Sequence, residues 1–463
     1  MSEALAAVGR AYDRVDEVDR PEVWIHLRPR ADVEADVRAQ AGRAAAGADL
    51  PLLGRLVAVK DNIDVAGLPT TAACPGVAWT PDADATAVAR LRAAGAVVLG
   101  KTNLDQFATG LVGTRSPYGA VRAADHPDRI SGGSSSGSAV AVALGIVDLA
   151  LGTDTAGSGR VPAALQGVVG VKPTPGLIPT TGVLPACRTL DCVSVLAREL
   201  PLAAEAVALM AGPDGVDALA RAVPASAPRA AADDPVLAVP RAADLAALDP
   251  RWRAAFDRHV AALAAAGWTL RETDLTPFLA TARLLYDGAF VAERYAAVGA
   301  LVATSPAGLD PVVGAIIRAA GELPAHRYAS DLVTLAELRV ATDAALAGAD
   351  ALLLPTTTHH PTLAEVAADP VAVNSRLGTY TNFCNLLGYA AVAVPVDPRV
   401  AGEHVGVTVL TRAFADAAAL DLAARVLAVA GPAAWTALDG PPCSGAEAAA
   451  ALTGAGRGLP VPA

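Results

Sequence analysis

Three segments of the sequence carry residue types that nucleophilic chemistry needs. Lys60, one of only three lysines, follows the apolar run 56–59. Two loops rich in glycine and serine, 131–138 (SGGSSSGS) and 152–160 (GTDTAGSGR), stand on either side of an apolar stretch. A serine from one of these loops could attack a carbonyl carbon if Lys60 served as its base.

A serine hydroxyl is a weak nucleophile until a base removes its proton. Lysine can be that base only when it is neutral, and burial among apolar strands favours the neutral form. Glycine-rich turns let successive backbone N–H groups converge on one point, as an oxyanion requires. Valine stands three residues before each lysine, so a serine–lysine pair must be assembled across the fold. Residue types alone leave ordinary loops and an exposed Lys60 as an open alternative.

Two other segments match known motifs by their letters. Residues 95–102 (GAVVLGKT) satisfy the phosphate-loop pattern, but the intervening AVVL is typical of a strand rather than a flexible loop. Residues 133–137 (GSSSG) fit a serine nucleophile elbow, which needs a strand directly before it. The preceding segment 124–131 is polar and turn-prone, and no local feature singles out a partner among the seven histidines. Nucleotide binding and a Ser-His-Asp esterase are therefore the weaker hypotheses.

The surrounding apolar patterns predict helices and strands in alternation. The first 200 residues combine amphipathic helical spacing at 1–45 with apolar runs further on. This alternation indicates an α/β layer architecture in which strands end near the candidate residues. The expected strands are 56–59, 96–99 and 168–171, and the expected helices are 84–94 and 139–151.

The second half is less uniform. Residues 201–240 are rich in Ala, Pro and Asp and predict a surface excursion. Helical patterns dominate 250–350, and apolar runs at 351–355 and 390–396 predict further buried strands. Residues 431–463, rich in Ala, Gly and Pro, predict a flexible C-terminal tail.

Composition argues against several classes of function. Of 463 residues, 53% are hydrophobic and 18% charged, which excludes global disorder. A net charge of −11 without any basic run argues against a nucleic-acid partner. The charged N-terminus does not resemble an export signal. The stretch 377–396 has no charged residue, but its Thr, Asn and Pro residues make it too polar to span a membrane. Five scattered cysteines without a CxxC pair predict a cytoplasmic protein with no metal site.

Residues 54–195 resemble the amidase signature family through a dense set of motifs. The resemblance implies a cofactor-free enzyme with an α/β/α layered fold, in which helices cover a central mixed sheet on both faces. It also implies one amidase domain over 1–430, with N-terminal helices at about 1–45 and a catalytic core at about 50–200. The segments that carry the resemblance are 54–63 (GRLVAVKDNI), 131–138 (SGGSSSGS), 152–164 (GTDTAGSGRVPAA) and 170–174 (GVKPT).

Enzymes of this family use a Ser-cisSer-Lys triad. Carried over by position, the lysine falls on Lys60, the serine after a cis peptide on Ser134, and the nucleophile on Ser158. Lys60 would accept a proton from Ser134, which would accept one from Ser158. Besides Ser158, the backbone N–H groups that would form the oxyanion hole belong to Thr155, Ala156 and Gly157.

Three further stretches, 100–113, 185–192 and 284–295, resemble the allophanate hydrolases within this family. Allophanate, or urea-1-carboxylate, is small, planar and anionic, and the forked donors of arginine suit its carboxylate. The resemblance gives this role to Tyr286 and Arg294, whose spacing of about two turns would let one helix face present both. The expected partner is thus a small anionic amide, with a homodimer left open.

The resemblance leaves two alternatives. Allophanate hydrolases commonly carry a second domain after the amidase core, and this chain ends where that domain would begin, so another small amide is an alternative substrate. The amidotransferase subunit for Glu-tRNA shares the core and would work within a complex, although it fits less well at 158–162 and 185–192. We expect Lys101 and Lys172 to be structural.

Overall fold

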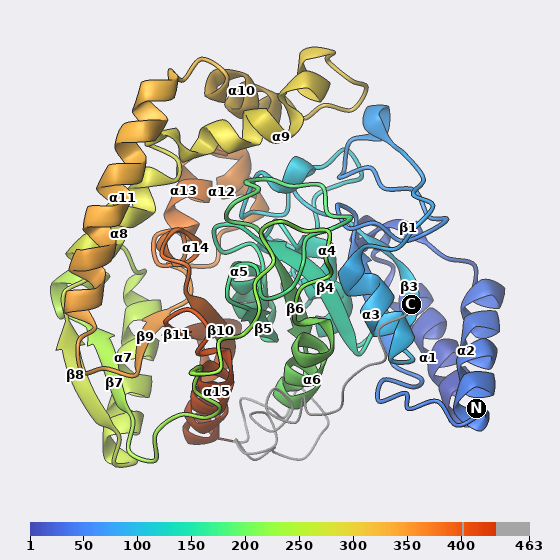
Figure 1. Cartoon of the computed structure of the whole chain (residues 1–463), viewed down its shortest axis with the longest axis horizontal. Coiled ribbons are helices and arrows are strands. Elements are labelled where there is room, and N and C mark those ends of the chain that lie inside the picture. Colours follow the sequence, from blue (N-terminus) through green and yellow to red (C-terminus); the bar gives the residue numbers. More distant parts are fainter. Residues whose placement is uncertain (401, 432–463) are drawn as a thin grey trace.

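A mixed sheet of 11 strands runs through residues 1–400 and 402–431, the part of the chain that this computed structural model describes (Figure 1). Its order is β1-β3-β2-β4-β6-β5-β10-β11-β9-β7-β8. Strand β2 runs parallel to β3 and β4, and β7 runs parallel to β8 and β9, whereas the other neighbours are antiparallel. The strands are β1 (Trp24–Leu27), β2 (Leu56–Lys60), β3 (Val97–Thr102), β4 (Leu149–Asp154), β5 (Val169–Lys172), β6 (Cys192–Ala197), β7 (Val236–Pro240), β8 (Thr269–Thr273), β9 (Ala351–Pro355), β10 (Ala390–Val400) and β11 (Glu403–Thr411).

Helices cover both faces of this sheet. Along β2, Val57 and Val59 belong to the apolar cluster that includes α6, whereas Leu56 and Ala58 belong to the cluster that includes α4. Helices α7 and α15 also contact the sheet, and α15 contacts α6. The predicted layered fold is therefore confirmed. The helices are α1 (Ser2–Val18), α2 (Arg30–Ala45), α3 (Thr86–Ala93), α4 (Ser136–Ala143), α5 (Arg160–Gln166), α6 (Leu200–Met210), α7 (Pro250–Ala265), α8 (Thr276–Leu284), α9 (Ala292–Ala303), α10 (Pro311–Ala320), α11 (Ala325–Ala345), α12 (Leu363–Ala368), α13 (Ala372–Leu377), α14 (Phe383–Leu386) and α15 (Asp416–Ala430).

The edge of the sheet that holds the candidate residues follows from strand direction. Strands β2, β3 and β4 are buried along their whole length, and covering both faces makes their sequences continuously apolar rather than alternating. Since they are parallel, their carboxyl ends meet at one edge. Lys60, Thr102 and Asp154 stand there as the last residues of the three strands.

A second group of helices lies beside this edge. Helix α9 packs against α10, and α8 packs against α11 (Figure 1). A small apolar cluster joins Val298 and Val302 of α9 to Phe107 and Cys74 in the loops that leave the sheet. This contact fixes the segment that contains Arg294 over the loops around the candidate lysine.

Two sequence predictions are wrong. The apolar stretch 139–151 is not one helix, because α4 ends at Ala143 and β4 begins at Leu149. Gly145 between them has a φ of 70°, which glycine adopts at little cost at a helix end. Composition alone does not distinguish a buried helix from a buried strand. The stretch 201–240 is also not an excursion throughout, since most of α6 and all of β7 lie in it.

The other predicted strands match β2, β3, β5, β9 and β10 with small shifts at their ends. Residues 432–463 lie outside the described residues, so the flexible tail at 431–463 and the single domain over 1–430 stay predictions. Among the helices of the described residues, none combines the length and apolarity that crossing a bilayer requires.

The motif 95–102 that imitates a phosphate loop is occupied by strand β3. Lys101 on this strand is fully buried, its Nζ lies 3.0 Å from an oxygen of the buried Asp61, and it donates to Thr70 Oγ1 at 2.8 Å. Both partners are buried side chains of this chain, as expected for a structural residue.

Lys101→Ala should lower the free energy of unfolding by about 3–5 kcal/mol, because Asp61 would remain as an uncompensated buried charge. Urea denaturation measures this change. The control Arg10→Ala removes an exposed pair with Glu3 and should cost less than about 1 kcal/mol. Unchanged stability together with lost nucleotide affinity would instead favour the phosphate-loop hypothesis.

Candidate active site

Lys60 at the end of β2 is fully buried and in direct contact with a serine. Its Nζ lies 2.8 Å from Ser134 Oγ and 2.7 Å from Thr153 Oγ1. Burial lowers the pKa of Lys60 from 10.5 to about 7, because loss of water disfavours the ammonium form, while nearby carboxylates oppose the shift. Near neutral pH a large fraction of this amine can therefore accept a proton from Ser134.

The loop before α4 presents Ser134 to this lysine. The Gly133–Ser134 peptide bond is cis. A Cβ on Gly133 would lie 2.1 Å from Asp105 Oδ2, so only glycine fits there. The Asp105 N–H donates to Ser134 O at 3.2 Å, and the Asp105 carboxylate accepts the N–H groups of Gly113 and Arg115 at 3.0 Å each. One buried aspartate thus holds the serine loop against the neighbouring segment.

Ser158 lies in the turn between β4 and α5 and is 2% exposed. Its Oγ donates to Gly110 O at 3.4 Å, and its carbonyl oxygen accepts the Ser135 N–H at 3.2 Å. The contacts among the described residues do not include a hydrogen bond between Ser158 Oγ and Ser134 Oγ. The proposed relay requires that bond, so the Ser158 side chain would have to rotate away from Gly110.

Asp154 holds the turn that contains Ser158. Its carboxylate accepts Nε and Nη2 of Arg160 at 2.9 Å each, and both side chains are fully buried. Although burial alone would raise it, the pKa of Asp154 lies below its usual value because of the Arg160 charge. Asn385 Nδ2 donates to Asp154 O at 2.7 Å, and Asn385 Oδ1 accepts from Arg160 Nη2 at 3.1 Å. These bonds fix the turn on both sides.

The predicted oxyanion donors are not equivalent. Within the described residues, the N–H groups of Thr155, Ala156 and Ser158 donate to no acceptor in the fold, so they are available to a ligand. The N–H of Gly157 donates to Asp154 Oδ1 at 2.8 Å and would have to give up this bond to reach an oxyanion. Gly157 has a φ of 131°. A side chain there would be strained.

Tyr286 and Arg294 are brought together, but not by one helix. Helix α8 ends at Leu284 and α9 begins at Ala292, so the expectation of a shared helix face is wrong. Arg294 Nη2 nevertheless donates to Tyr286 OH at 3.3 Å. The chain turns between the two residues, and this turn brings the side chains into contact.

Arg294 is a buried cation that makes no direct ion pair among the described residues, although the negative charge of the buried Asp191 acts on it. It is 2% exposed, and its Nη1 donates to Thr109 Oγ1 at 2.9 Å and to Ala108 O at 3.3 Å. Its Nε has no partner, and no carboxylate forms an ion pair with it, among the described residues. Thr109 adjoins Gly110, whose carbonyl oxygen accepts from Ser158, so the guanidinium and the candidate nucleophile approach the same short segment. A buried unpaired guanidinium is costly unless an anion occupies the site.

Sequence reasoning missed the residues that hold this site. Asp105, Asp154 and Asp191 lie within the motifs quoted above, but nothing in the sequence distinguishes them from exposed aspartates. Asn385 lies outside those motifs and carried no signal.

The remaining predictions can be compared with the described residues. Cys187 and Cys192 are buried and free. Lys172 Nζ donates to Pro173 O at 2.8 Å. In the described part of the chain, no cluster of three or more His, Cys, Asp and Glu side chains could hold a metal ion.

Comparison with known proteins identifies relatives. The model of the Amidase family matches residues 6–420. The urea amidolyase of Lachancea kluyveri is 47% identical over 391 residues, which cover 83% of this chain and 21% of that protein. A glutamyl-tRNA(Gln) amidotransferase subunit from Symbiobacterium thermophilum is 34% identical over 448 residues, covering 89% of this chain and 91% of that one.

A solved structure of Kluyveromyces lactis allophanate hydrolase superimposes with a TM-score of 0.86 at 42% identity, and covers 93% of this chain and 71% of that chain. The chain therefore spans about a fifth of the length of the urea amidolyases it matches (21%).

The low lysine content permits a direct measurement of the Lys60 pKa. In protein labelled with ¹³C-lysine, the signal that Lys60→Met removes should titrate with a midpoint near 7, because burial favours the neutral amine above that pH. Heteronuclear NMR between pH 5 and about 10.5 follows this change. The range begins below the expected midpoint and ends near the reference pKa of lysine, so it separates a lowered pKa from an ordinary one. A Lys60 signal that stayed in the charged form throughout would contradict the proposed base.

Proposed function

We propose that this chain, which belongs to the amidase family, hydrolyses allophanate and releases ammonia through an acyl-enzyme on Ser158. The observation that carries the choice of substrate is the buried Arg294, which contacts Thr109 and Tyr286 and has no carboxylate partner among the described residues. An anionic group on the substrate would supply the missing charge. The likeness to urea amidolyases and to an allophanate hydrolase supports the same substrate.

The reaction would begin when Ser158 Oγ attacks the carbonyl carbon of the terminal amide. The Ser158 proton passes to Ser134, and the Ser134 proton passes to neutral Lys60, which lies 2.8 Å away. The N–H groups of Thr155 and Ala156 would stabilise the charge on the carbonyl oxygen. The C–N bond to the terminal nitrogen then breaks, and ammonia leaves with the proton returned by Lys60.

Water completes the cycle. It attacks the acyl carbonyl carbon while the same relay accepts its proton, and the ester bond to Ser158 breaks. Ser158 recovers its proton, and the product keeps both carboxylate groups on one nitrogen. Arg294 and Tyr286 would hold the carboxylate that the substrate already carried, so that the terminal amide faces Ser158.

We also propose that the enzyme works in the cytoplasm on a freely diffusing substrate. The four cysteines among the described residues are all free and buried, as is common in a reducing compartment. The net charge of −11 argues against a nucleic-acid partner. Association as a homodimer stays a prediction.

A second candidate is an amidotransferase subunit. The observation that favours it is the 34% identity over 448 residues with the glutamyl-tRNA(Gln) amidotransferase subunit of S. thermophilum. Such a subunit would act within a complex. The isolated chain would then be inert on small anionic amides.

The first test is ammonia release from fresh allophanate by the purified chain. Wild type should turn the substrate over, and Ser158→Ala should lower kcat by roughly 10⁴-fold or more because the nucleophile is gone. Ser330→Ala on exposed α11 is the control and should match wild type. Hydrolysis of other amides but not of allophanate would refute the proposed substrate and would be consistent with the proposed triad. No activity on any amide would favour the amidotransferase subunit.

The second test asks whether Arg294 binds the carboxylate of the substrate. Arg294→Gln should lower kcat/KM for allophanate by roughly 10²- to 10³-fold, since an anionic substrate loses its charge partner. Activity on biuret, which carries a neutral amide in place of the carboxylate, should change much less. Arg283→Gln, at the end of α8, is the control. Equal losses on both substrates would show that Arg294 only supports the fold.

A further inference from the structure

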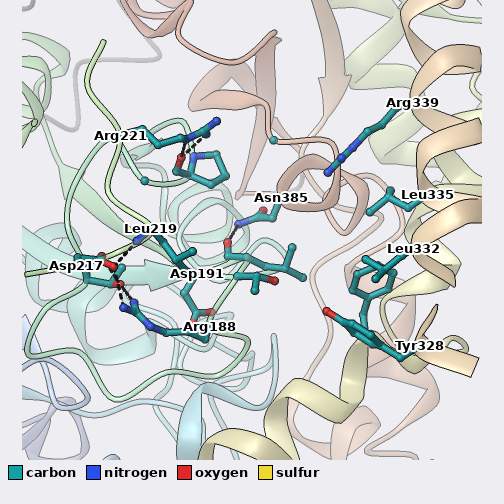
Figure 2. A pocket seen from close by; sticks show the side chains of 17 residues that line it. Arg188, Asp191, Asp217, Leu219, Arg221, Tyr328, Leu332, Leu335, Arg339 and Asn385 are labelled. Atoms are coloured by element: carbon teal, nitrogen blue, oxygen red, sulfur yellow. Dashed lines mark hydrogen bonds and ion pairs between the residues drawn. The ribbon is translucent and has the colours of Figure 1, made fainter. Parts of the chain in front are cut away.

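A cavity lies beside Asp191 and Asn385, two residues that hold the candidate active site. Its volume is about 380 Å³, and it opens between the segments 175–191 and 217–221 and helix α11 (Figure 2). Lys60, Ser134, Ser158 and Arg294 do not line it. It is therefore distinct from the site proposed above, and its size falls in the range of pockets that hold small organic molecules.

One wall of this cavity is apolar. Leu332 and Leu335 of α11 face it together with Tyr328, and Phe290 lies 5.3 Å from Tyr328 between ring centres. Figure 2 shows the α11 side chains gathered along one side. Leu332 is 47% exposed, so part of this wall is open to solvent. This wall could cover the apolar body of a ligand.

Two solvent-exposed arginines carry positive charge at the cavity. Arg221 donates to Pro175 O and stands 4.6 Å from the ring centre of Phe414, and Arg339 Nη2 donates to Leu386 O at 2.7 Å. Within the described residues, neither guanidinium forms an ion pair with a carboxylate. Figure 2 shows them on opposite sides of the cavity. Most of their N–H donors remain available to an anion.

The other charged groups of the lining are already paired. Arg188 forms an ion pair with Asp217 at 2.7 Å, so the two charges cancel. Asp191 accepts the Thr155 hydroxyl and the backbone N–H of Ala186, and burial raises its pKa. The cavity therefore presents a net positive charge beside an apolar wall.

We propose that this cavity binds a small organic anion, with its carboxylate or phosphate group held by Arg221 and Arg339 and its apolar body against α11. Arginine suits either group because its N–H donors pair with two oxygens at once. The floor of the cavity contains Asp191 and Asn385, which on their other side hold Thr155 and Asp154 of the active site. A ligand there would contact the residues that position the nucleophile turn.

Calorimetric titration of the full chain tests this proposal. The probe is 3-phenylpropionate, the Ser158→Ala background prevents turnover, and 3-phenylpropan-1-ol is the uncharged counterpart. We expect the acid to bind at one site and the alcohol not to bind, because the arginines require an anion. Arg221→Gln and Arg339→Gln should each weaken binding by at least tenfold. Inorganic phosphate, which has no apolar body, should bind more weakly, and equal affinity would overturn the organic part of the proposal.

Further variants separate this cavity from the active site. Leu332→Glu places a negative charge in the cavity without touching the arginines and should also abolish binding. Arg327→Gln, elsewhere on α11, should leave binding unchanged. Binding that survives Arg221→Gln and Arg339→Gln but is lost in Arg294→Gln would place the probe in the active site and overturn the proposal, as would the absence of any binding. The result does not depend on the proposed hydrolysis, because no residue of that triad lines the cavity.

Discussion

The site depends on keeping an amine neutral in the interior of a sheet. Lys60 is fully buried, and the loss of water is the largest influence on its pKa. Asp105, Asp154 and Asp191 each act in the opposite direction, because a negative charge nearby favours the ammonium form. A base of this kind works only if desolvation outweighs those carboxylates, and the pKa near 7 shows that it does.

The arrangement of the carboxylates makes this balance possible. Asp105 accepts backbone N–H groups around the loop of Ser134, and Asp154 is paired with Arg160. Asp191 accepts the Thr155 hydroxyl and N–H groups of the segment that precedes it. Each carboxylate is already stabilised by donors that are not Lys60. The groups that would otherwise charge the lysine are therefore the groups that position the loop of Ser134, the turn of Ser158 and the candidate oxyanion donors.

Sequence patterns predicted the parts of this arrangement that depend on local residue types. Buried strands such as β2 and β9 were predictable because a strand covered on both faces is continuously apolar. The same uniformity made 139–151 ambiguous, since a buried helix has the same composition and only the conformation at Gly145 separates α4 from β4. Tyr286 and Arg294 were predicted as a pair, but the break between α8 and α9 was not. Asn385 could not be predicted, because its contacts with Asp154 and Arg160 join positions more than 200 residues apart.

Burial has opposite consequences for the charges of the two basic side chains in the proposed site. Arg294 keeps its charge when buried because its ordinary pKa is far above neutral, whereas Lys60 loses its charge under the same burial. The positive charge of Arg294 also favours the neutral form of Lys60. An anionic substrate that pairs with Arg294 would cancel part of this effect and make Lys60 more basic as the substrate binds. Each neutral Lys60 would then be a stronger base, but a smaller fraction of Lys60 would be neutral near pH 7. Recognition of the carboxylate and the protonation state of Lys60 would therefore be electrostatically linked.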